Sequence, residues 1–123
     1  MTEIIIATFV VYLVHLLLPG QLAFFRKEVS NAYLLGPRDE EVEVSNIVKR
    51  ARRASANLQE SLLIFLPLAI MAGDNGAASE AALIWLGLRI AYLVSYLMGV
   101  NYVRTIIWFI SLFYLYQMAS TLV

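Results

Sequence analysis

Charged and amide side chains recur at helical spacing in the segment RARRASANLQE, residues 50–60. At about 100° per residue, four of them fall within roughly 80° of arc and share one helical face: Arg50, Arg53, Asn57 and Glu60. A second polar face repeats the spacing i, i+3, i+7 and carries Arg89, Tyr92 and Tyr96. If the two faces meet, with Arg104 nearby, they line a groove rich in hydrogen-bond donors. Such a groove suits a small anionic ligand.

The elements that carry these faces are predicted to be membrane helices. Hydrophobic residues make up 61% of the 123 residues, and the mean hydropathy is strongly positive, which favours a membrane class. A helix needs roughly 20 apolar residues to cross a hydrocarbon core of about 30 Å. Four segments qualify, with helices expected at about 4–25, 46–73, 80–101 and 104–123. They leave no room for another domain, so residues 1–123 are predicted to form one all-α, integral membrane four-helix bundle.

Each of the two middle segments carries one charge that needs an explanation. A charge near the centre of a membrane helix costs on the order of 2.5–3.5 kcal/mol on insertion scales. Glu60 and Arg89 lie at similar predicted depths, so an ion pair between them would remove much of that cost. Two hypotheses explain such a pair: it is purely structural and sets the helix register, or it forms part of a ligand-binding groove.

The positive residues predict the topology. Seven of the nine Lys and Arg residues lie between Arg26 and Arg53, whereas the connection GDNGAASE at 73–80 has none. By the positive-inside rule the first connection is cytoplasmic, and both termini face the opposite side. A short third connection around 100–104, where Asn101 and Arg104 interrupt the apolar pattern, then returns to the cytoplasm.

The composition also excludes several kinds of functional site. The absence of cysteine excludes thiolate nucleophiles and cysteine metal sites supplied by this chain. One histidine makes a zinc site implausible, so no metal is expected. The net charge of zero gives no support for nucleic-acid binding.

The pattern R-A-x-R-A-x-x-N-x-x-E at residues 50–60 resembles the second helix of the MAPEG family, membrane-associated proteins of eicosanoid and glutathione metabolism. The stretches LGPRDE at 35–40 and RIAYLVSYLMGVNYVRTIIWF at 89–109 resemble bacterial members. The resemblance therefore covers nearly the whole chain.

This resemblance implies a homotrimer that uses glutathione as co-substrate, in a glutathione-dependent transferase or peroxidase reaction on hydrophobic electrophiles or lipid hydroperoxides. Arg104 would be catalytic and face the sulfur. The implied glutathione-binding residues are Arg53, Asn57, Glu60, Arg89, Tyr92 and Tyr96. It also implies membrane lipid as surroundings and a hydrophobic small molecule as second substrate. The expected location is a bacterial inner membrane, with both termini periplasmic.

Alternatives accompany these assignments. The family also includes noncatalytic members, so a lipid-binding or scaffold protein of the same fold is the second functional reading. Arg104 also fits an interfacial anchor at a helix end. Tyr92 and Tyr96 also fit helix-packing positions.

Overall fold

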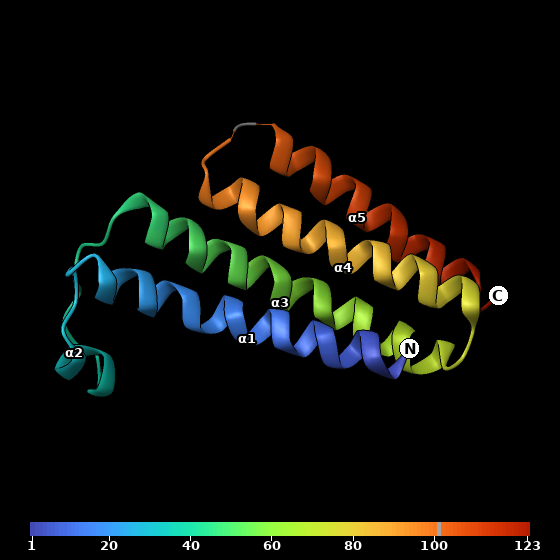
Figure 1. Cartoon of the computed structure of the whole chain (residues 1–123), viewed down its shortest axis with the longest axis horizontal. Helices are drawn as coiled ribbons and strands as arrows, with labels where there is room; N and C mark the ends of the chain where they lie inside the picture. Colours follow the sequence, from blue (N-terminus) through green and yellow to red (C-terminus); the bar gives the residue numbers. More distant parts are fainter. Residues whose placement is uncertain (101) are drawn as a thin grey trace.

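The computed structural model describes every residue except Asn101, which we expected in the third connection. Within the described residues the regular structure is helical. The five helices, in chain order, are α1 (Thr2–Phe25), α2 (Asn31–Leu35), α3 (Asn46–Ala72), α4 (Gly76–Leu97) and α5 (Val103–Ser120). The four long helices lie side by side and alternate in direction (Figure 1). Each of α1, α3 and α4 packs against the next long helix, with further contacts of α3 with α5 and α1 with α4.

Both chain termini lie at the end where α3 turns into α4, and the α1–α3 connection and the α4–α5 turn lie at the other end (Figure 1). By length and composition, α1, α3 and α4 are able to cross a membrane. The shorter α5 has 18 residues and includes Arg104, Thr105 and Gln117, which lower its apolarity. Three membrane-capable helices are therefore shown, and α5 packs along α4 beside them.

The helix ends differ from the expected ones for local reasons. The helix expected at residue 80 begins at Gly76, because Oδ1 of Asn75 accepts a hydrogen bond from the amide of Ala78 over 3.0 Å. It ends at Leu97, before Gly99, whose φ is +71°. Helix α2 was not expected, and Ser30 caps it by accepting from the amide of Tyr33.

The helix expected from residue 46 does begin there, without a side-chain cap. Ser45 is the N-cap residue, yet its side chain makes no capping hydrogen bond. Its backbone amide instead donates to Oε1 of Glu28 over 2.9 Å. This bond ties the start of α3 to the segment that follows α1.

The core lies mainly between α3, α4 and α5. Phe65 of α3 stacks on Trp85 of α4 with ring centroids 4.1 Å apart, and Met118 of α5 joins them. The same cluster contains the buried alanines Ala69 of α3 and Ala81 and Ala82 of α4. Small side chains let two helix backbones approach closely, which is how membrane helices gain packing energy without a hydrophobic drive from water.

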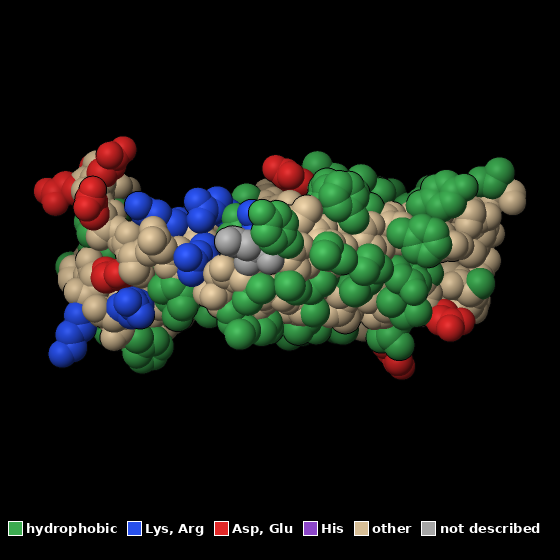
Figure 2. All heavy atoms as spheres, turned by 90° about the horizontal axis from the view of Figure 1, so that it is seen from above, with side chains coloured by type: hydrophobic (Ala, Val, Ile, Leu, Met, Phe, Trp, Pro, Cys, Tyr) green, Lys and Arg blue, Asp and Glu red, His purple; other side chains and the backbone are tan. Residues whose placement is uncertain are grey.

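The surface is apolar along most of its length, with large exposed side chains such as Leu63 at 77% and Ile70 at 70% exposure. Figure 2 shows these hydrophobic side chains over most of the molecule and the Lys and Arg side chains towards one end. That end holds the α1–α3 connection. Side chains of this kind suit a lipid or protein environment rather than water.

Candidate functional site

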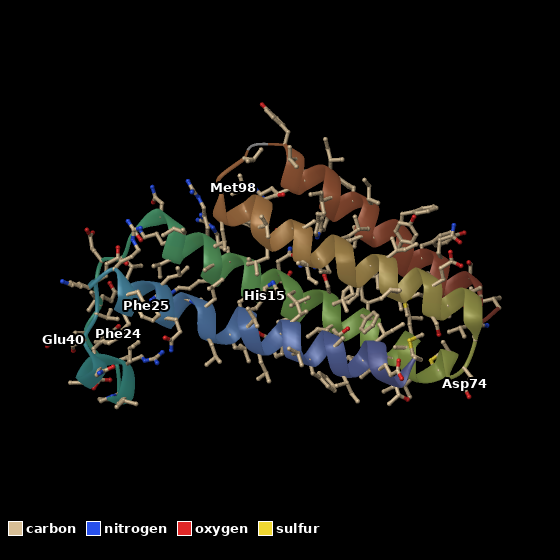
Figure 3. The ribbon with its side chains drawn as sticks, viewed as in Figure 1. His15, Phe24, Phe25, Glu40, Asp74 and Met98 are labelled. Atoms are coloured by element: carbon tan, nitrogen blue, oxygen red, sulfur yellow. The ribbon has the colours of Figure 1, made fainter. Side chains whose placement is uncertain are left out.

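A recess of about 380 Å³ lies at the basic end of the molecule, between the start of α3 and the turn from α4 to α5. In Figure 3 this end is marked by Met98, whereas Asp74 marks the opposite turn. The side chains and backbone that line the recess come from Arg50, Arg53, Tyr96, Gly99, Val100 and Arg104. Three of these six residues are arginines and none is acidic, so the recess favours an anionic ligand.

Two arginines from different helices face the same aromatic ring in this recess. The Cζ atom of Arg104 lies 4.6 Å from the ring centroid of Tyr96, and that of Arg53 lies 5.7 Å away. Contacts of this length are cation–π interactions, which orient the guanidinium groups over the ring. Tyr96 thereby holds the first turn of α5 next to the second turn of α3.

A second polar cluster lies deeper between α3 and α4. The guanidinium of Arg89 is fully buried, and its Nη2 atom donates to Oδ1 of Asn57 over 2.6 Å. Its Cζ atom also lies 4.5 Å from the ring centroid of Tyr92. Tyr92 in turn meets Tyr96 edge to face, with centroids 5.6 Å apart. The edge-to-face contact joins the deep cluster to the recess.

Glu60 does not pair with Arg89 within the chain, so that expectation is wrong. Glu60 is exposed, and the partner of Arg89 is Asn57. Among the described residues the one ion pair within 4.0 Å joins Arg26 to Glu28. The reason is rotational: three residues after Asn57, Glu60 is turned about 60° away from it around the helix axis. Core packing points Asn57 towards α4 and leaves Glu60 on the outer face.

The structure therefore brings six of the seven expected site residues to the α3–α4–α5 side, and Glu60 stands apart from them. It also adds Arg50, which the sequence placed on the polar face but not among the glutathione-binding residues, and Gly99, to which the sequence assigned no role. A Cβ atom built on Gly99 would lie 2.7 Å from Nη1 of Arg50, so the guanidinium rests directly on this glycine. The helical face at 50–60 already contained Arg50, but nothing in the sequence linked it to a turn 49 residues later.

Chemically, the arrangement is an anion-binding recess with an aromatic floor. Arginine stays protonated at physiological pH and offers several N–H donors, so it can hold carboxylates and stabilise a developing anion without titrating. The recess opens beside apolar helix surface, with Val100 at its rim and Val103 exposed nearby. An anionic ligand bound in the recess would there be close to an apolar molecule dissolved in the bilayer.

Comparison with known proteins identifies the family. The MAPEG family model matches residues 2–123, essentially the whole chain. No curated protein and no solved structure matches the sequence. Because the family match extends over all the helices described above, the chain belongs to the MAPEG family, membrane proteins of glutathione and eicosanoid metabolism.

Proposed function

We propose that this protein is a glutathione-dependent transferase or peroxidase that acts on hydrophobic electrophiles or lipid hydroperoxides from the bilayer. The observation that carries the proposal is the convergence of Arg53 and Arg104 on Tyr96 in a recess without acidic side chains. Glutathione has two carboxylates and one thiol. Neighbouring guanidinium groups would bind the carboxylates and stabilise the thiolate form of the thiol. Arg53 and Arg50 at the start of α3 would bind carboxylate, and Arg104 would face the sulfur.

The chemistry requires a thiolate. A free cysteine thiol has a pKa of about 8.5, so most of it is protonated at neutral pH. A cation beside the sulfur stabilises the charged form and lowers that pKa. The thiolate then attacks an electrophilic carbon, an S–C bond forms, and the leaving group departs with its electron pair.

With a lipid hydroperoxide the same thiolate attacks the terminal peroxide oxygen. The O–O bond breaks, and the lipid alkoxide takes up a proton to give an alcohol. The sulfenic acid of glutathione that remains is reduced by a second glutathione, which yields the disulfide and water. Both reactions use one activated sulfur, and they differ in the second substrate.

A homotrimer is part of the proposal, and Glu60 supports it. Glu60 lies near the middle of the 27 residues of α3, roughly 20 Å from either end at 1.5 Å per residue. It is exposed on an outer face with Ala56, Leu63 and Pro67. A carboxylate that faces lipid at this depth is costly. Another copy that covers this face would remove the cost and supply hydrogen-bond donors to Glu60.

The proposal is tested by calorimetric titration of the detergent-purified protein with glutathione, followed by ultraviolet absorbance of the bound thiolate at neutral pH. Wild type is expected to bind glutathione and to show the thiolate signal. Arg104→Ser should keep most of the affinity, because Arg50 and Arg53 remain, but should lose the signal. Its rate with an aromatic electrophile should fall by far more than its affinity.

The matched control is Lys27→Gln, which removes one positive charge at the same end of the molecule. Lys27 does not line the recess. The variant should retain both signal and rate. Bound glutathione without a thiolate signal in wild type, or an Arg104→Ser variant that conjugates at the wild-type rate, contradicts the role of Arg104. A wild-type protein that binds no glutathione favours the noncatalytic, lipid-binding or scaffold function instead.

A further inference from the structure

A larger recess, of about 560 Å³, lies on another side of α3 from the candidate site. It is enclosed by the C-terminal half of α1, by α2 and by the face of α3 that carries Arg52 and Ser55. Arg52 is turned about 100° around the helix axis from Arg53, and about 160° from Arg50, so it belongs to a different surface from the glutathione recess. None of the three arginines that line the candidate site, Arg50, Arg53 and Arg104, lines this larger recess.

The recess is polar at one end and apolar at the other. Arg38 and Arg52 stand at the polar end together with Tyr33, and neither arginine has a carboxylate within 4.0 Å among the described residues. The Nε and Nη2 atoms of Arg38 both donate to the carbonyl of Leu34, at 3.2 and 3.0 Å. These bonds orient the guanidinium at the C-terminal end of α2.

The apolar end is a wall of α1. Leu16 and Leu17 line it, and both are about half exposed, at 48% and 62%. They belong to a helix that is able to cross a membrane, so this wall continues into hydrocarbon. Leu35, which also lines the recess, is 89% exposed, and Phe25 at the end of α1 is 74% exposed. Large exposed apolar side chains beside arginines are typical of the boundary between headgroups and acyl chains.

Three glutamates, Glu40, Glu41 and Glu43, lie in the adjoining recess, which shares Tyr33, Arg38 and Arg52 with this one. Their negative charges would repel a large or multiply charged anion, so the site suits a single compact anion close to the two guanidinium groups. A phosphate diester satisfies that limit, since it carries one negative charge and can accept from both arginines.

We propose that this recess binds one anionic phospholipid, with its phosphate between Arg38 and Arg52 and one acyl chain along Leu16 and Leu17. A recess that is basic at one end and apolar along one wall favours a lipid over a soluble anion. Inorganic phosphate has no apolar group to pack against the leucines. The inference is independent of the proposed glutathione chemistry, because the two recesses share no lining residue.

The experiment is native mass spectrometry of the intact detergent-purified protein with added phosphatidylglycerol or phosphatidylcholine. We expect phosphatidylglycerol to remain bound at lower concentration than phosphatidylcholine. Arg38→Gln and Arg52→Gln should each weaken phosphatidylglycerol by about tenfold, as expected for loss of a charge-assisted hydrogen bond. Lys27→Gln, an equal charge change outside the recess, should weaken it by less than about twofold.

Four outcomes would overturn the assignment. Equal retention of the two lipids would show that no headgroup is recognised, and equal losses in Lys27→Gln and Arg52→Gln would show only general attraction at a basic surface. Competition by inorganic phosphate at the concentration of the lipid would point to a soluble anion. To test for a protein occupant, Leu17→Cys supplies the only thiol in the chain. If delipidated Leu17→Cys stays protected from a membrane-permeant maleimide, a second copy covers the recess.

Discussion

The fully buried guanidinium of Arg89 donates to the side-chain oxygen of the half-buried Asn57 across the interface between α4 and α3, over 2.6 Å. This contact replaces the ion pair with Glu60 that the sequence suggested. Asn57 is neutral, and among the described residues Arg89 has no carboxylate within 4.0 Å; its guanidinium also lies over the ring of Tyr92. The contact therefore sets the relative register of α3 and α4 next to the candidate site.

The first prediction follows from that hydrogen bond. Asn57→Ala leaves a buried guanidinium without its acceptor and should lower the free energy of unfolding by about 1.5–3 kcal/mol. Arg89→Leu should also destabilise the protein, because it leaves the Asn57 amide unpaired. The double variant should lose less than the sum of the two single losses, measured by thermal unfolding in detergent.

The control pair is Glu60→Gln with Arg89→Leu. These two residues do not meet in the chain, so their effects on unfolding should add. Additive losses for Asn57 and Arg89, or strong coupling between Glu60 and Arg89, would contradict the observed pairing.

The second prediction concerns the glycine beneath Arg50. Gly99→Ala places a Cβ atom 2.7 Å from Nη1 of Arg50 and puts a nonglycine residue at φ +71°. The backbone strain should cost on the order of 1–3 kcal/mol of stability. The displaced guanidinium should also raise the KM for glutathione. Gly87→Ala is the matched control, because a Cβ there has no atom within 4 Å and alanine favours the helix, so stability should stay level or rise. Equal effects of the two substitutions would argue against the contact.

The third prediction concerns the outer face of α3. Glu60→Lys reverses the charge on the face that we propose another copy covers, so it should shift the mass in mild detergent from three chains towards one. Glu80→Lys makes the same change at the exposed start of α4 and should leave the mass unchanged. A wild-type protein that runs as a monomer in mild detergent would contradict the proposed homotrimer.

The fourth prediction is the topology. A reporter that works only in the cytoplasm should be active when inserted after Pro37, in the basic connection, and inactive when fused after Val123. The reason is the concentration of seven of the nine positive residues between Arg26 and Arg53. Activity of the fusion after Val123 would reverse the assigned orientation.

The membrane helices and most of the residues that meet between them could be predicted from the sequence alone. Apolar length predicts membrane helices because a bilayer has one thickness, and a period of 3.6 residues places Tyr92 with Tyr96, and Arg53 with Asn57, on common faces. These predictions need only local geometry. They identified α1, α3 and α4 as membrane-capable helices and most of the residues that meet between α3, α4 and α5.

Other features were decided only by tertiary structure. Helical period places Asn57 and Glu60 on one broad face, but packing of Ala54, Leu58 and Phe65 against the neighbouring helices sets how α3 is rotated. That rotation, and not charge, makes Asn57 the partner of Arg89 and leaves Glu60 outside. The contact of Arg50 with Gly99 likewise depends on where α4 ends, since residues 49 positions apart meet only when two helices are packed in register.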